Sequence, residues 1–288
     1  MKLHCIPILS ALFTSLVCFS NPATKISDNS PSSGIVIRWN DCEQTIDGFG
    51  IAQAGWAKEL FAFKNRKQVM DKMFGNDGLR LNILRGEIFP HYWENKEDKD
   101  FNLNDDINIE LCDSDFNNKS DDLLRRGQLW LTLEAKNKYH INKLVFSTWS
   151  APAWMKSNGK VSNGKLKPEC YQDFANYLAA FYKAYKSKGI TPYAISPSNE
   201  PGYAAPWNSS LWTADEMGKF ITSNLGPTFQ KENIPAKIIF GENPLWSVVM
   251  PQLKMVSSKD FTDTILQDYP EIKKFNLIAA GHGYSLSP

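Results

Sequence analysis

The chain has 288 residues, of which 42% are hydrophobic and 22% are charged, and its formal net charge at pH 7 is +1. This composition is ordinary for a globular protein and supplies enough apolar residues for a large core. Lys and Arg are not clustered, as they are in proteins that bind nucleic acid or anionic membrane surfaces, so neither partner is expected.

The first 20 residues are typical of a secretory signal peptide. Lys2 gives a positive start, and residues 6–19 form a mostly apolar, uncharged run that is too short to span a bilayer comfortably. The polar stretch at residues 21–34 predicts a flexible linker. We therefore expect a secreted protein, extracellular or periplasmic, whose folded part is residues 35–288.

Cysteine and histidine residues give no sign of a metal site. The 5 Cys and 4 His are scattered along the chain, without the paired spacing of a zinc site or of a disulfide framework. No glycine-rich phosphate loop is present in the sequence either. We expect no metal and no cofactor, and at most one disulfide.

Short apolar runs alternate with longer amphipathic segments, which is typical of β/α units around a parallel sheet. Most of these runs are almost continuously apolar, as in strands that are covered on both faces. The six expected strands are Thr45–Phe49, Leu79–Leu84, Lys143–Phe146, Pro192–Ile195, Ala236–Phe240 and Phe275–Ala279.

Three of the intervening helices have clear signals. Tyr171–Lys188 has an aromatic stripe on one helical face and ends before Gly189. Another helix begins at Thr213, which forms a capping box with Glu216. A third begins at Ser120, where acidic residues suit the positive end of a helix.

This order of elements predicts an α/β fold, an incomplete (β/α)₈ TIM barrel with about six of its eight strands present. A doubly wound open sheet is the alternative on pattern alone. A complete barrel takes about 250 residues, and counting from Thr45 the printed sequence stops before strands seven and eight. We therefore expect a C-terminally truncated barrel.

Polar, aromatic and acidic residues follow the expected strands, at the edge where barrel enzymes place their active sites. Sugars suit such a site, because their C–H faces stack on aromatic rings and their hydroxyls need hydrogen-bond partners. Glycoside hydrolysis also needs two carboxylates. The candidate site residues are Arg85, Trp149, Asn199, Glu200, His282 and Tyr284.

Five motifs occur in order at these strand ends. They are Ile46-Asp47-Gly48-Phe49-Gly50, Leu84-Arg85, the Trp-Ser-Ala-Pro-Ala-Trp-Met-Lys-Ser-Asn segment at Trp149–Asn158, Ser198-Asn199-Glu200-Pro201 and His282-Gly283-Tyr284-Ser285. Asn-Glu-Pro alone would arise by chance in roughly a few per cent of such chains, but the five together are specific. From about Thr45 to Pro288 the chain resembles glycoside hydrolase family 30. That resemblance implies a retaining β-glycosidase barrel with a side β-sandwich, whose first strand would include Val36 and Ile37.

The resemblance also implies a role for each candidate. Glu200 is the expected acid/base and Asn199 the hydrogen-bond partner of the sugar 2-hydroxyl. Arg85 would hold the nucleophile ionised. The remaining three would wall the pocket of the attacked sugar: Trp149, His282 and Tyr284.

Most of these roles have a structural alternative. Glu200 would be an ordinary loop carboxylate before a turn-forming Pro. Arg85 would then pair with Glu87 or Glu242, and His282 would be a structural histidine. Trp154 is as well explained by core packing as by sugar binding, and Trp149 has the same alternative.

The nucleophile is the missing part. The family places it after a seventh strand, beyond Pro288, and Glu242 or Glu87 is the internal alternative. Without a nucleophile, the printed fragment is expected to be inactive.

The motifs look most like those of the xylanase branches of the family. We therefore expect a monomer that acts on a polysaccharide or glycoside, with xylan or glucuronoxylan favoured as the substrate of an endo-type enzyme. The alternatives are a glucosylceramidase-like activity, a β-1,6-glucanase activity, and a non-catalytic carbohydrate-binding remnant.

Overall fold

The computed structural model describes residues 38, 40–41, 44–53, 56–97, 122–247 and 256–284. The chain divides into two units, residues 1–46 and 47–288, and all of the helices and strands named here belong to the second. The expected signal peptide and linker, together with Val36 and Ile37, lie outside the described residues.

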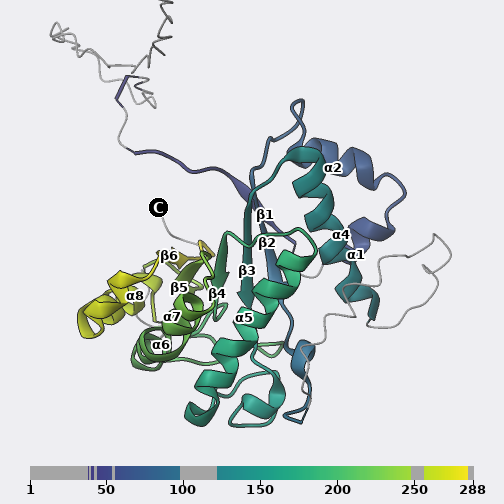
Figure 1. Ribbon diagram of the computed structural model, residues 1–288. Coiled ribbons are helices and arrows are strands. Elements are labelled where there is room, and N and C mark those ends of the chain that lie inside the picture. Colours follow the sequence, from purple (N-terminus) through teal and green to yellow (C-terminus); the bar gives the residue numbers. More distant parts are fainter. Residues whose placement is uncertain are drawn as a thin grey trace, which may run out of the picture. The chain divides into compact units, whose positions relative to one another are not determined.

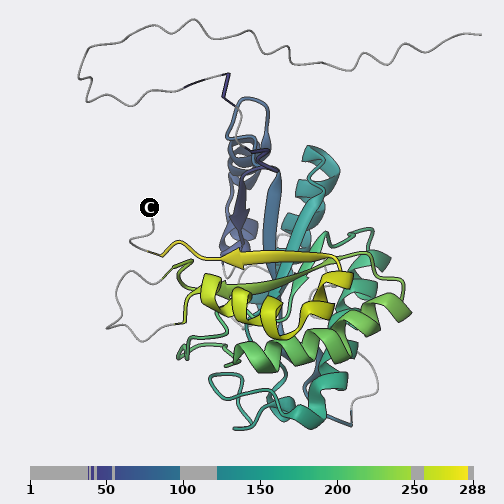
Figure 2. The ribbon, with the colours of Figure 1, turned by 90° about the vertical axis from the view of Figure 1, so that its left-hand side faces the viewer.

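Six strands form one sheet in which all paired neighbours are parallel and the spatial order follows the chain order. Figure 2 shows β6 lying across the direction of β1 and β2, so the sheet twists and curves strongly. This half-barrel is the predicted incomplete TIM barrel rather than an open doubly wound sheet. The strands are β1 (Gly50–Ala52), β2 (Ile83–Ile88), β3 (Lys143–Thr148), β4 (Ala194–Ser196), β5 (Lys237–Asn243) and β6 (Leu277–Gly281).

Helices cover the sheet along its length (Figure 1). α1 packs against α4 beside β1 and β2, and α6 packs against α8 near β5 and β6. The α-helices are α1 (Ala57–Ala62), α2 (Arg66–Phe74), α4 (Asp122–Tyr139), α5 (Tyr171–Ser187), α6 (Ala214–Phe220), α7 (Gly226–Lys231) and α8 (Ser258–Asp268). Short helical turns are η1 (Pro90–Trp93), η3 (Ala153–Met155), η4 (Pro168–Cys170), η5 (Ile221–Leu225) and η7 (Pro270–Lys274).

The core is built largely from aromatic rings. In α5, Phe181 and Tyr185 are fully buried, and both pack edge-on against Phe146 of β3 at centroid distances of 5.1 and 5.0 Å. Such pairs stabilise a fold by more than their buried area alone. The stripe that the sequence predicted on this helix is therefore what fixes α5 to the sheet.

Two predicted helices are confirmed. The helix expected at Tyr171–Lys188 ends one residue earlier, and Gly189 follows with a φ of 78°. The capping box is present, because Glu216 N donates to Thr213 Oγ1 and Thr213 N donates to Glu216 Oε2. The third helix, α4, begins at Asp122, two residues after the predicted start at Ser120, which itself lies outside the described residues.

Strand positions differ from the prediction in one systematic way. The predicted strand Thr45–Phe49 is wrong, since β1 is Gly50–Ala52 and both Ile46 and Phe49 are exposed. The other strands also run further toward their C-terminal ends than their apolar runs do, so that Arg85 lies inside β2 and Glu242 inside β5. The reason is that polar side chains at these ends are buried against one another, as the site shows below.

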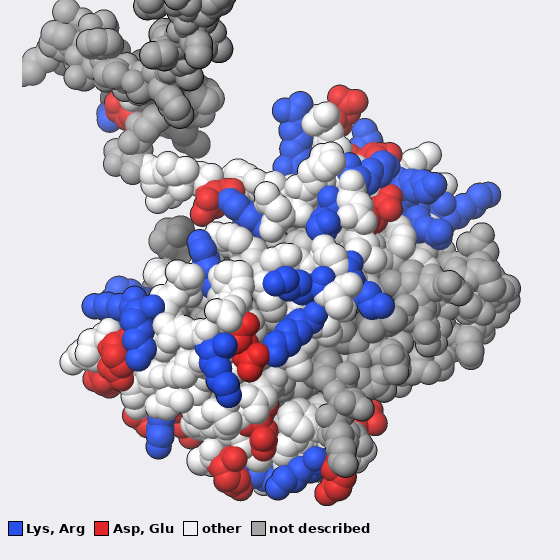
Figure 3. Space-filling view, in the orientation of Figure 1, with Lys and Arg blue, Asp and Glu red and all other residues white. Residues whose placement is uncertain are grey.

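The surface mixes charges of both signs. Figure 3 shows Lys and Arg interspersed with Asp and Glu on the face in view, and exposed ion pairs such as Lys183–Glu232 link neighbouring elements. No helix within the described ranges is both long enough and apolar enough to cross a membrane.

Candidate active site

The turn after β4 holds Glu200 by its backbone. Asn199 N donates to the carbonyl of Thr148 at 2.7 Å, and Glu200 N donates to the carbonyl of Glu242 at 3.0 Å. Glu200 itself has a φ of 51°, a conformation that costs energy for a residue with a side chain. Because the ends of β3 and β5 hold this turn from both sides, the strained conformation of Glu200 is kept.

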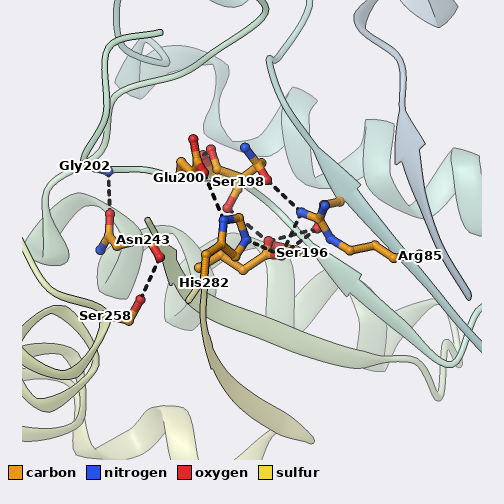
Figure 4. Close-up of polar contacts among 11 residues, drawn as sticks. Arg85, Ser196, Ser198, Glu200, Gly202, Asn243, Ser258 and His282 are labelled. Atoms are coloured by element: carbon orange, nitrogen blue, oxygen red, sulfur yellow. Dashed lines mark hydrogen bonds and ion pairs between the residues drawn. The ribbon is translucent and has the colours of Figure 1, made fainter. Parts of the chain in front are cut away.

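Arg85 links the neighbour of Glu200 to β5. Its Nη2 donates to Asn199 Oδ1 at 2.7 Å and to Glu242 Oε1 at 2.8 Å. Figure 4 shows Arg85 pointing into the polar cluster that contains Ser196 and His282. The guanidinium carbon lies 4.5 Å from the ring centroid of Trp149, a distance at which a cation is attracted to an aromatic face. Arg85 therefore contacts Asn199, Glu242 and Trp149 at the same time.

Glu242 is the buried anion of the site, with 4% of its surface exposed. Besides Arg85, it accepts hydrogen bonds from Ser147 Oγ, at 2.8 Å to Oε2, and from Ser196 Oγ. Burial acts to raise the pKa of Glu242, but Arg85, His282 and Ser196 outweigh it and lower the pKa to about 2. Glu242 is thus ionised at any ordinary pH, with its oxygens already engaged by protein groups.

His282, directly after β6, lies between the two carboxylates. Its Nδ1 is 2.9 Å from Glu200 Oε1, and its Nε2 is 3.7 Å from Glu242 Oε1. Burial acts to lower the pKa of His282, yet the contacts with Glu200 and Glu242 raise it above the ordinary value. His282 thereby ties Glu200 to the charged centre around Glu242.

Asn243 joins three segments through a bulge at the end of β5. Its Oδ1 accepts from Gly202 N at 2.7 Å, while its carbonyl accepts from His282 N at 2.9 Å and from Ser258 Oγ at 3.2 Å (Figure 4). The side chain is completely buried. Asn243 therefore sets the turn that carries Glu200 in register with the segment that carries His282.

The structure brings all six predicted site residues together. Glu200 lies in a pocket of ≈ 520 Å³ whose lining includes Trp149, Asn199, Tyr203, Trp207 and Tyr284. Arg85 is bonded to Asn199, and His282 packs edge-on against Tyr284 at 5.3 Å. The arrangement supplies one accessible carboxylate, an amide and aromatic walls, which is a suitable combination for a sugar ring.

A second pocket of ≈ 470 Å³ adjoins the first. Its lining includes Glu87, Ser162, Pro206 and Asn208, and it shares Trp149 and Trp207 with the pocket of Glu200. A further pocket of ≈ 580 Å³ lies at the opposite ends of β3 to β5 and has no Asp or Glu among its described lining residues. Among these three pockets, only the first two are lined by a described carboxylate, the group that glycoside hydrolysis needs.

Sequence reasoning missed part of the site. Ser147, Ser196 and Asn243 were not predicted, because small polar residues near strand ends are common and their partners come from distant segments. Glu242 was considered only as an alternative partner of Arg85 or as a nucleophile, and it is indeed that partner. The sequence does contain one signal for Glu242 and Asn243: a charged and a polar residue directly follow the apolar run of β5.

Trp154 is a packing residue rather than a wall of either pocket. Its indole Nε1 donates to the carbonyl of Trp93 at 3.0 Å, and the two rings meet edge-on at 5.1 Å. In the part of the chain that the structure describes, no group of three or more His, Cys, Asp and Glu could hold a metal ion.

Comparison with known proteins agrees with this geometry. The family model described as the glycosyl hydrolase family 30 TIM-barrel domain matches residues 46–252. An endo-1,6-β-D-glucanase from Neurospora crassa is 28% identical over 237 residues, covering 76% of this chain and 45% of that protein. The lysosomal acid glucosylceramidase of Mus musculus is 30% identical over 123 residues, covering 37% of this chain and 24% of that protein.

A solved structure gives the same result in three dimensions. The family 30 subfamily 8 xylanase from Clostridium acetobutylicum superposes with a TM-score of 0.62 at 26% identity, over 85% of this chain and 51% of that one. The chain thus spans about half of the length of this xylanase, and less than half of the curated relatives' length. Since the family model covers well over half of the printed residues, the chain belongs to glycosyl hydrolase family 30.

Proposed function

We propose that this chain contributes the acid/base half of a retaining β-glycosidase site, with Glu200 as the proton donor and acceptor. Support comes chiefly from the environment of its carboxylate. Oε1 is held by His282 Nδ1 at 2.9 Å, while Oε2 has no hydrogen-bond partner among the described residues, and the side chain lines an aromatic pocket. A glycosidic oxygen in that pocket would therefore meet the free oxygen of Glu200.

The surrounding groups would serve the same reaction. Asn199 lines the pocket next to Glu200 and is anchored by Arg85, so it is placed to bond a hydroxyl of the attacked sugar. Trp149 and Tyr284 would supply the walls against which the sugar ring packs.

The nucleophile is proposed to be a carboxylate outside the described residues, after a seventh strand, as the family resemblance implies. Glu242 fits that role poorly. It is 4% exposed, it lines neither pocket, and it already binds Arg85, Ser147 and Ser196. Attack on a sugar would need that network to be broken first.

The proposed substrate is a β-linked polysaccharide, with xylan or glucuronoxylan favoured. Two adjoining pockets that share Trp149 and Trp207 suit several consecutive sugar residues better than a single sugar on a lipid. Relatives that act on β-1,6-glucan and on glucosylceramide make these the two substrates to compare. Export is also proposed, from the apolar run at residues 6–19.

The test uses the full-length protein and its Glu200→Gln variant, with Glu169→Gln as a control on an exposed carboxylate. Glu200→Gln should slow hydrolysis of xylan by about 10²–10⁴-fold, because the leaving oxygen is no longer protonated. A dinitrophenyl glycoside needs no such proton, so its first-step burst should survive. Equal activity of both variants on xylan would remove Glu200 from the role, and activity only on β-1,6-glucan or glucosylceramide would reassign the substrate.

A further inference from the structure

Lys156 is a buried cation that the proposed chemistry does not use. Its residue surface is 1% exposed, and no described carboxylate forms an ion pair with it. Its ammonium donates instead to two neutral oxygens, Ser150 Oγ at 3.1 Å and the carbonyl of Ser209 at 2.7 Å. Burial lowers the pKa of Lys156 to about 8. Burying an ammonium without a counter-charge costs free energy of folding, so stability alone does not explain why Lys156 is buried here.

The two acceptors belong to the two segments that wall the sugar pockets. Ser150 directly follows Trp149 at the end of β3, and Ser209 comes two residues after Trp207 in the segment that follows Glu200. Both indoles line both pockets. The ammonium of Lys156 therefore connects the Ser150 hydroxyl, next to Trp149, to the Ser209 carbonyl, two residues after Trp207.

Neutral hydrogen bonds also link these segments to each other and to the loop at residues 161–164. Ala151 N donates to Ser210 Oγ at 3.3 Å, and Ser209 N donates to the carbonyl of Val161 at 3.0 Å. These are neutral hydrogen bonds, whereas hydrogen bonds from an ammonium are roughly twice as strong. The ammonium of Lys156 is therefore the strongest of these ties between the two segments.

We propose that Lys156 is a positioning residue that sets the separation of Trp149 and Trp207, and with it the path of a glycan chain from one pocket into the next. The inference rests on the proposed function, because it takes the ligand to be a glycan. It goes further because it assigns the alignment of two adjoining sugar sites to Lys156, a residue that lines neither pocket.

Substitution of Lys156 by Met keeps the apolar stem but removes the donor. The carbonyl of Ser209 then loses the short bond at 2.7 Å, and only neutral hydrogen bonds still hold the two segments relative to each other. Arg at the same place retains a cation that can reach the same oxygens. Lys160, four residues further on and exposed, gives a matched control in which the same atoms are removed from the same segment.

The experiment measures glycan affinity by isothermal titration calorimetry, with every variant made in the Glu200→Gln background so that no ligand is hydrolysed. The two ligands are xylobiose, short enough for one pocket, and xylotetraose, long enough to span both. Titrations are done at pH 6, where Lys156 is protonated, and at a temperature where circular dichroism shows each variant folded. Glu200→Gln alone is the reference.

If Lys156 aligns the pockets, Lys156→Met should weaken xylotetraose binding by about tenfold and change xylobiose binding by less than about twofold, a difference well resolved by calorimetry. Lys156→Arg should recover most of the loss, and Lys160→Met should match the reference. A purely structural role would weaken both ligands alike. Should Lys156→Met fail to fold, Ser150→Ala removes one of the two acceptors and should show the same selectivity, about threefold.

Each other result overturns the inference. Equal weakening of both ligands, or no weakening of either, removes the positioning role while leaving the glycan cleft intact. Absence of binding of both ligands to the reference protein would instead contradict the xylan cleft of the proposed function, and the assignment of Lys156 to a xylan path would fall with it.

Discussion

Arg85 and Glu242 form an ion pair with 2.8 Å between Nη2 and Oε1, and only 5% of the Glu242 side chain is exposed. The same Nη2 bonds Asn199 at 2.7 Å, beside Glu200. The pair therefore connects the buried charge of β5 to the residue that carries the proposed proton. It also explains why Glu242 behaves as a fixed anion of the scaffold.

Glu242→Gln should destabilise the protein strongly. The substitution preserves shape but leaves the guanidinium of Arg85 without its counter-charge, and breaking a buried pair in this way costs about 3–5 kcal/mol. Glu216→Gln is the matched control, because Glu216 pairs with Lys165 at the surface and Gln retains the capping box; it should cost less than about 1 kcal/mol. Urea unfolding measures both, and similar costs would contradict this account.

The low pKa of Glu242 predicts how stability depends on acid. Its pKa falls from 4.5 to about 2 on folding, so its contribution is complete above pH 4.5 and is lost as the pH falls toward 2. The difference in unfolding free energy between the wild type and Glu242→Gln, measured by urea titration between these two values, should shrink as the pH is lowered. A difference that stays constant over that interval would mean that Glu242 is not held ionised.

Gly202 and Asn243 should be energetically coupled. A Cβ at Gly202 would lie 2.7 Å from Asn243 Oδ1, the atom that accepts the Gly202 N–H, so Gly202→Ala must displace the Asn243 side chain. We expect Gly202→Ala to be clearly destabilising in the wild type and much less so in the Asn243→Ala background, with an interaction energy of about 0.5–3 kcal/mol. A double-mutant cycle on unfolding free energies measures this, and additive effects would show that the clash is relieved elsewhere.

The two tryptophans of the Trp149–Asn158 motif should respond in opposite ways. Trp149→Ala removes a wall of both pockets and should weaken xylotetraose binding by about tenfold or more, without a large loss of stability. Trp154→Phe removes the hydrogen bond to the Trp93 carbonyl and should cost about 1 kcal/mol of stability while leaving affinity unchanged. Calorimetric titration and thermal unfolding of both variants distinguish these outcomes, and a loss of affinity in Trp154→Phe would place that ring in the cleft.

Much of the fold was predictable because it rests on local patterns. The apolar runs located five of the six strands to within a few residues, and the capping box at Thr213 and Glu216 marked a helix start without any tertiary information. The strand ends were predicted less well. Leu79, which the apolar pattern assigned to a strand, is 73% exposed, and the backbone turns at Arg80 with a φ of 52° before β2 begins.

The sequence by itself determined which side chains are available for the proposed chemistry: Glu200 in its Asn-Glu-Pro turn, Arg85, and the aromatic residues at strand ends. Only the tertiary structure decided how they are joined, because the partners are far apart in the chain. Arg85 and Glu242 are 157 residues apart, and Glu200 and His282 are 82 apart. A parallel sheet brings the same ends of distant strands together, and burial then makes each polar group depend on whichever partner is there.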